Sequence, residues 1–151
     1  MIQKCPELLE IERNLISIDE ILRPILEQDD FISSFGGTFI NIFRNHIVVN
    51  TVNYSKVDDL LALPQITSNE KFLYFNKANN SMSQIKFNFE QINVRADLIK
   101  PKQVFIYIDM LLNNNVLYFE RSDINNTEFI TAAKPFNPTI FYTEKFTTRK
   151  I

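Results

Sequence analysis

The residue types that most often do chemistry in proteins are scarce in this chain. It contains one histidine, His46, and one cysteine, Cys5, which lie far apart in the sequence. A zinc site made of Cys and His ligands needs more of both residue types. Counting alone does not exclude a Ser-His-Asp triad, but His46 falls in a predicted hairpin turn and no serine has a recognisable oxyanion-hole context. We assign His46 a structural or surface role and treat Cys5 as an incidental thiol.

Two acidic pairs, Asp29-Asp30 and Asp58-Asp59, have the residue types of paired catalytic carboxylates. The first pair lies at a predicted helix end and the second at a predicted helix start, where solvated or capping roles are favoured. The two glycines of the chain are adjacent, so neither a glycine-rich phosphate loop nor a G-x-S-x-G elbow is present. The sequence therefore predicts no catalytic residue, no metal site and no cofactor, and we expect a protein that is not an enzyme.

Charge and hydropathy narrow the range of partners. The formal net charge of −2 comes from 18 acidic and 16 basic residues, which are well mixed along the chain. A nucleic-acid surface would need a basic stripe and a membrane-surface patch would need a polybasic cluster, and neither is present. No window is apolar for long enough to cross a bilayer. We expect no nucleic-acid partner and no membrane association.

The composition is that of a folded protein. Hydrophobic residues make up 45% of the 151 residues, which suffices for the core of one domain or of two small subdomains. A single cysteine cannot form an internal disulfide. The N-terminal residues include acids where a signal peptide would be apolar, so we expect the chain to start in the cytosol or to lack its natural beginning.

The elements that position these residues are organised around the stretch 36–64. Gly36 and Gly37 precede two apolar runs, residues 38–43 and 47–52, which are separated by the polar residues 44–46. The runs are rich in Phe, Ile, Val and Thr, and they predict a β-hairpin. We expect the glycine pair to provide a tight start to the hairpin that a side chain would disfavour.

A short helix and a strand are predicted to complete this unit. Ser55-x-x-Asp58 resembles a capping box, Pro64 is expected to stop the helix, and residues 71–75 predict a strand. A long helix over residues 6–29 is predicted before the hairpin. Pro24 should kink or divide that helix, with Asp19 as a possible restart cap. We expect its apolar stripe to cover the protein's own sheet, although a partner-binding face is the alternative.

The second half of the chain repeats this order with little residue identity. Ser81-x-x-Gln84 is predicted to open another helix, which runs to about residue 97. The elements expected after it are strands at 103–109 and 116–120, a short helix capped by Asn125-x-x-Glu128 and ended by Pro135, and a last strand at 139–143. The predicted fold class is α+β, with two small antiparallel-sheet subdomains, each roughly strand-strand-helix-strand and each preceded by a long helix. We place the subdomains at residues 1–97 and 98–151.

The segments FGGTFIN at 35–41 and IVVNTVN at 47–53 carry a resemblance to a known family. They resemble the pro-region of secreted chymotrypsin-like serine proteases of the alpha-lytic protease and streptogrisin kind. The resemblance is strongest over residues 35–66 and extends more loosely through the two-unit layout. It implies a two-subdomain α+β module that lowers the folding barrier of its protease domain and then blocks the active site until it is cleaved. It also implies an extracellular location.

We expect neither a protease domain nor a signal peptide within the given 151 residues, which is a departure from the family pattern. Binding, folding assistance and inhibition of a chymotrypsin-like protease would therefore act in trans. Two alternatives stay open: a stand-alone α+β interaction domain without a protease link, and the front fragment of a longer serine endopeptidase.

The residues that we expect to touch the partner lie at the end of the chain. Ile140, Phe141 and Tyr142 belong to the last predicted strand, whose exposed edge can pair with a protease hairpin. The tail that follows would lie in the substrate cleft; its predicted contact residues are Thr143, Glu144, Lys145 and Phe146. The alternative is that the strand belongs to the core and that the tail is frayed.

Overall fold

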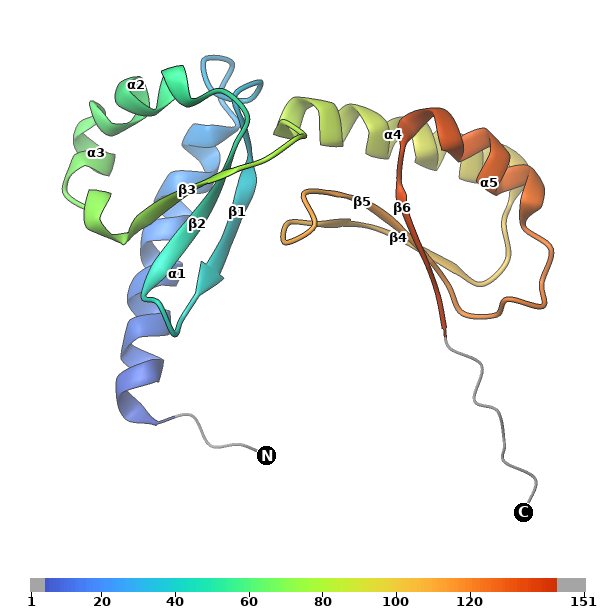
Figure 1. Cartoon of the computed structure of the whole chain (residues 1–151), viewed down its shortest axis with the longest axis horizontal. Helices are drawn as coiled ribbons and strands as arrows, with labels where there is room; N and C mark the ends of the chain where they lie inside the picture. The colour runs from blue at the N-terminus through green and yellow to red at the C-terminus, as the bar shows by residue number, and fades with distance from the viewer. Residues whose placement is uncertain (1–4, 144–151) are drawn as a thin grey trace. The chain divides into compact units, whose positions relative to one another are not determined.

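A computed structural model of the chain describes residues 5–143. It contains helices and two three-stranded sheets, which confirms the predicted α+β class (Figure 1). The chain forms two compact units. The first comprises Met1–Ile85 and Met110–Asn113, and the second comprises Lys86–Asp109 and Asn114–Ile151.

Helix α1 (Pro6–Leu26) opens the first unit. Pro6 occupies its first turn, where the missing N–H costs nothing, and the acidic Glu7 complements the positive end of the helix dipole. The helix is continuous through Pro24, so the predicted division of the helix by Pro24, with Asp19 as a restart cap, is wrong. Pro24 has no N–H to donate to the carbonyl four residues earlier, but buried apolar residues hold the last turn of the helix against the sheet.

The first sheet contains β1 (Phe35–Asn41), β2 (His46–Thr51) and β3 (Leu73–Lys77), in that order. Strands β1 and β2 form the predicted hairpin, but β1 begins earlier than expected and includes both glycines. The register of the pair shifts between Phe35 and Thr38, which marks a β-bulge at the glycine pair.

The connection from β2 to β3 is more helical than the sequence predicts. It contains a 3₁₀ turn, α2 (Val57–Leu61), α3 (Pro64–Thr67) and a second 3₁₀ turn. The side chain of Asn53, not that of Ser55, caps this segment by accepting a hydrogen bond from the Ser55 N–H. Pro64 was predicted to stop a helix. It also begins α3, at the helix position where proline is best tolerated.

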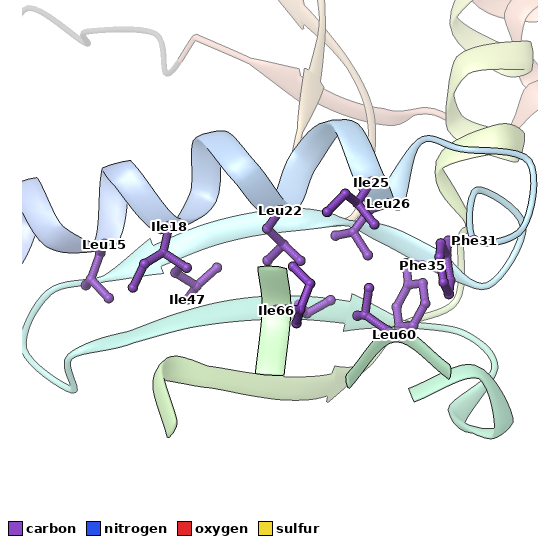
Figure 2. Close-up of a cluster of buried hydrophobic side chains, with 11 residues drawn as sticks. Leu15, Ile18, Leu22, Ile25, Leu26, Phe31, Phe35, Ile47, Leu60 and Ile66 are labelled. Atoms are coloured by element: carbon purple, nitrogen blue, oxygen red, sulfur yellow. The ribbon is translucent and has the colours of Figure 1, made fainter. Parts of the chain in front are cut away.

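One hydrophobic core holds the first unit together. Figure 2 shows side chains of α1 lying over β1 and β2, with Leu60 of α2 and Ile66 of α3 completing the cluster. The apolar stripe of α1 therefore packs against the protein's own sheet, as predicted. The buried residues of this core are Leu15, Ile18, Leu22, Ile25, Leu26, Phe31, Phe35, Ile47, Val49, Leu60 and Ile66.

The second unit follows the same plan. Helix α4 (Met82–Ile99) begins where predicted, and the Ser81 hydroxyl accepts the Gln84 N–H at 3.2 Å. The elements after it are β4 (Val104–Asp109), β5 (Asn114–Phe119), α5 (Thr127–Ala133) and β6 (Thr139–Tyr142). The strand order is β4-β5-β6. Ile92 of α4 and Phe129 of α5 pack with Leu117 and Phe119 of β5 to form the core.

The prediction of purely antiparallel sheets is wrong, because each sheet is mixed. The first two strands of each unit are antiparallel, but β3 runs parallel to β2 and β6 runs parallel to β5. Each helical connection crosses over to the end of the sheet at which the preceding strand began, so the strand after it runs parallel to that strand. The order strand-strand-helix-strand is confirmed in both units.

The repeat extends to the backbone of the two hairpin turns. Asn45 and Asn113 hold the same turn position and both have positive φ, 54° in each case. Each donates its N–H to the carbonyl three residues earlier, at 3.1 Å for Asn45 and 3.3 Å for Asn113. Asparagine tolerates the left-handed region better than most residues, so the two Asn residues serve the same local purpose.

Candidate functional site

The predicted partner-binding strand, β6, lies at an edge of the second sheet. It pairs only with β5, from Val116↔Thr139 to Phe119↔Tyr142. Within residues 5–143 no strand pairs with its other side, which we call the free edge of β6. Three of the predicted contact residues, Ile140, Phe141 and Tyr142, are therefore together on one edge strand. Three others, Glu144, Lys145 and Phe146, lie outside the described residues.

The direction of the main-chain groups of β6 follows from one hydrogen bond. The Thr143 N–H donates to the Phe119 carbonyl of β5 at 3.0 Å. Successive residues of a strand direct their N–H and C=O groups to opposite edges. Phe141 therefore also faces β5, whereas Ile140 and Tyr142 direct their main-chain groups toward the free edge.

The side chains of β6 divide between the two faces of the sheet. Ile140 packs against the core of the second unit, which agrees in part with the alternative of a core strand. Phe141 and Tyr142 are exposed, with 41% and 51% of their surfaces accessible. The Tyr142 ring also stacks on Phe119, with centroids 5.5 Å apart. The strand is anchored from one face while it exposes aromatic side chains on both.

The hydroxyl of Thr143 fixes the end of the strand. It donates to the hydroxyl oxygen of Tyr118 on β5 at 2.9 Å. Together with the Thr143 main-chain bond to β5, this contact continues the β5–β6 ladder one residue beyond Tyr142. Thr143 is thus a positioning residue of the strand, in addition to any contact with a partner.

The other sheet edges carry features that discourage pairing with a second chain. Strand β1 has a bulge at its glycines, β3 ends with Lys77, and β4 ends with Asp109. Bulges and charged residues are common protections of edge strands. Strand β6 (TIFY) contains no charge, no proline and no bulge. It is the least protected of the four edges.

The structure leaves no room for a Cβ at either residue of the glycine pair, for a reason that the sequence did not reveal. A Cβ on Gly36 would collide with the Asn113 side-chain nitrogen and with the Asn80 carbonyl oxygen. Gly37 has φ +94°, and a Cβ there would collide with the Met110 sulfur. The pair leaves room for residues 110–113, which belong to the same unit.

An asparagine network holds residues 110–113 in this place. The Asn113 amide nitrogen donates to the carbonyl of Asn80 at 2.8 Å, and the Asn80 N–H donates to the Asn113 amide oxygen, also at 2.8 Å. The Asn80 side chain donates to the Asn113 carbonyl, and the Asn50 side chain donates to the Met110 carbonyl, both at 2.8 Å. The Asn-rich composition of these loops was the only signal of this network in the sequence.

The residues first considered for chemistry are dispersed in the structure. The His46 ring stacks on Tyr74, with centroids 5.9 Å apart and planes inclined by 15°. Cys5 is exposed just before α1. Asp58 and Asp59 lie in the first turn of α2. None of these side chains meets another in an arrangement for nucleophilic or acid–base catalysis within the described part of the chain.

A buried carboxylate that the sequence analysis missed lines a cavity of about 200 Å³ in the first unit. Asp19 is only 8% exposed; it accepts the Thr38 hydroxyl at 2.6 Å and pairs with Arg23 at 3.0 Å. The bond to Thr38 joins α1 to β1, and the buried, partnered carboxylate is best explained as a structural contact. Leu26, Gly37, Met82 and Met110 are among the other lining residues.

The described residues also bear on metal binding and on membrane insertion. Among residues 5–143, no group of three or more His, Cys, Asp or Glu side chains is arranged to hold a metal ion. No helix in the described chain has the length and hydropathy needed to cross a membrane.

Comparison with known proteins assigns no family. No protein-family model matches the chain, and no curated protein matches it. The resemblance of residues 35–53 to protease pro-regions stays a prediction, carried by strands β1 and β2 and the turn between them.

Proposed function

We propose that this protein is a non-catalytic binding module that takes up an extended segment of a partner protein along the free edge of β6. The main support is an unprotected edge strand whose Ile140 and Tyr142 direct their main-chain groups away from β5. Such a strand can form a ladder of hydrogen bonds with an added strand, while its side chains provide specificity.

The partner that the sequence favours is a chymotrypsin-like serine protease domain. The resemblance of residues 35–41 and 47–53 to the pro-regions of such proteases supports this choice. A hairpin of the protease would pair with β6, and stabilisation of its late folding transition state would accelerate its folding. The segment that follows Thr143 would enter the substrate cleft and inhibit the protease.

A proline substitution tests the strand pairing directly. Tyr142→Pro removes a main-chain donor that faces the free edge, whereas Tyr142→Val removes the ring and keeps that donor. The two variants and the unchanged protein are titrated against an active-site-blocked chymotrypsin-like protease, with binding followed by calorimetry. We expect the proline to weaken binding about ten-fold, because it removes a hydrogen bond and adds a ring at the contact. The valine variant should bind nearly as the unchanged protein does.

Other outcomes of this titration would contradict strand pairing or change the kind of partner. Equal losses in the two variants would contradict pairing through the main chain. Binding of unrelated extended peptides with the same dependence on Tyr142→Pro, but not of the protease, would support an interaction module without a protease link. Absence of binding to either at micromolar concentration would overturn the proposal. Urea unfolding of each variant shows whether the fold is intact.

A further inference from the structure

A cavity of about 330 Å³ opens on the first sheet, at the end where the β1–β2 turn lies. Its lining residues are Asn41, Arg44, His46, Val48 and Tyr74. Asn41 pairs with His46 across the hairpin, and Val48 pairs with Tyr74 of β3. Because His46 and Val48 are two residues apart on β2, the four strand residues share one face of the sheet. We call this cavity the hairpin pocket.

The hairpin pocket lies on the face of the sheet opposite α1. Ile47 and Val49, which alternate with His46 and Val48 along β2, belong to the core beneath α1. Figure 2 shows Ile47 on that side, next to the α1 side chains. Val48 is only 7% exposed and gives the pocket an apolar surface, whereas the Tyr74 ring beside it is 54% exposed. The pocket therefore combines an apolar part with polar side chains that reach solvent.

Four of the five lining side chains can donate hydrogen bonds: a guanidinium, an imidazole, a phenol and a carboxamide. Within residues 5–143, the Arg44 guanidinium and the Tyr74 hydroxyl have no hydrogen bond or ion pair. The His46 ring contacts Tyr74 only by stacking, with centroids 5.9 Å apart. The Asn41 carboxamide oxygen accepts the Arg44 main-chain N–H at 3.2 Å, so its NH₂ group can still donate. Donors thus gather around the pocket without acceptors of their own.

The charge of the hairpin pocket is positive. Arg44 lines it, and no acidic residue does so in the described part of the chain. Because β3 runs parallel to β2, the turn before β3 brings Glu70 and Lys71 to this end of the sheet, and their charges are of opposite sign. Helix α1 carries further acidic residues, but it packs on the other face. The local charge therefore favours an anionic ligand.

We propose that the hairpin pocket binds the phosphoryl group of a small phosphate ester. The fork of the Arg44 guanidinium fits two oxygens of such a group, and His46 and Asn41 can donate to the others. A phosphoryl group offers three strong acceptor oxygens, which suits this set of donors better than a carboxylate does. The apolar surfaces of Val48 and Tyr74 can contact the carbon atoms of the ester.

The size of the pocket favours a small ligand over a polymer. A volume of about 330 Å³ lies at the lower end of the range for small-molecule sites. A nucleic acid would need a stripe of basic residues, whereas Arg44 is the one arginine or lysine that lines the pocket in the described chain. This binding goes beyond the proposed strand addition at β6 and does not depend on it.

Titration with phenyl phosphate, followed by ¹H–¹⁵N spectra of the labelled protein, provides the first test. We expect the amide signals of Arg44, His46 and Tyr74 to shift, and those of the second sheet to remain in place. Phenol keeps the ring and lacks the phosphoryl group, so it should cause no shifts at the same millimolar concentration. Equal shifts with phenol, or no shifts with phenyl phosphate, would overturn the proposal.

Three further probes distinguish the possible sources of the anion. Inorganic phosphate should bind about five-fold more weakly than phenyl phosphate, since it has no carbon atoms to bury. Benzoate should also bind about five-fold more weakly, because it offers fewer acceptor oxygens and less charge. Equal affinity for inorganic phosphate or for benzoate would overturn the assignment to a phosphate ester. A phosphotyrosine peptide that binds about ten-fold more tightly than phenyl phosphate would overturn the small ligand in favour of a protein segment.

A matched pair of arginine variants locates the binding. Arg44 and Arg13 are both exposed residues of the first unit, but Arg13 lies on α1 and does not line the pocket. Arg44→Gln should weaken binding of phenyl phosphate about ten-fold, because it removes a charged donor. It keeps the main-chain N–H that bonds Asn41. Arg13→Gln removes the same charge and should leave the affinity unchanged. Equal effects of the two substitutions would overturn the assignment to the hairpin pocket.

The two proposals fail separately. The hairpin pocket belongs to the first unit and β6 to the second, so Arg44→Gln should leave strand addition at β6 intact. Tyr142→Pro should abolish strand addition and leave the affinity for phenyl phosphate unchanged. Urea midpoints of all variants control for loss of the fold. Loss of phenyl phosphate binding in a folded Tyr142→Pro variant would contradict a separate site on the first sheet.

Discussion

The side-chain amide of Asn113 donates a hydrogen bond to the main-chain oxygen of Gly36 at 3.2 Å, although 77 positions separate the two residues. The same amide group bonds Asn80 through both its nitrogen and its oxygen. A side chain that both donates and accepts is required here, and the missing side chain of Gly36 provides the space. This contact explains why a glycine pair stands inside a strand.

Asn113→Asp should therefore destabilise the protein by about 1–3 kcal/mol, because it removes the two donors and places a carboxylate against carbonyl oxygens. Aspartate also tolerates positive φ, so the expected loss of stability does not come from strain in the backbone of the turn. The control is Asn125→Asp, since Asn125 is exposed and only its side-chain oxygen bonds, to the Thr127 N–H. Urea unfolding midpoints compare the two variants. Similar small shifts in both would show that the network contributes little.

Gly37→Val should destabilise the fold by about 1–3 kcal/mol, because a β-branched residue is strained at positive φ. The added side chain would also collide with Met110. Lys56→Gln serves as the comparison, since Lys56 makes only a partly exposed ion pair with Asp59 at 3.6 Å. Thermal or urea unfolding measures the difference. Equal midpoints for the two variants would make the glycine incidental.

Deletion of residues 144–151 should weaken inhibition of a chymotrypsin-like protease and leave the fold unchanged. The last described strand ends at Tyr142, and Thr143 completes its contacts with β5. Residual peptidase activity of the protease is measured against increasing concentrations of the full and the shortened chain. Circular dichroism verifies that both are folded. An unchanged inhibition constant would reject a role for the tail in the cleft but not the partner.

The isolated chain should have no peptidase activity of its own, because its one histidine, His46, stacks on Tyr74 and no serine in the sequence has a recognisable oxyanion-hole context. A casein substrate and a serine-directed fluorophosphonate probe test this expectation. Turnover, or labelling that a Ser→Ala substitution removes, would contradict it.

The order of the secondary-structure elements could be predicted from the sequence because its signals are local. Two apolar runs separated by the polar residues 44–46 predicted the β1–β2 hairpin, and Ser81 with Gln84 predicted the start of α4. The final strand, which carries the candidate site, was also predicted, and it ends at Tyr142, one residue earlier than expected. Each of these signals lies within a few residues of the element that it specifies.

Other features were decided only by tertiary structure. The parallel direction of β3 and β6 depends on the path of the helices before them, and no local pattern in either strand encodes it. Pro24 is accommodated because the last turn of α1 is packed against the sheet. The edge position of β6 depends on pairing with a strand twenty or more residues earlier in the chain. Phe105, Tyr118 and Phe141 likewise lie side by side only because three strands place them in register, and a sequence pattern with a period of two cannot specify which strands become neighbours.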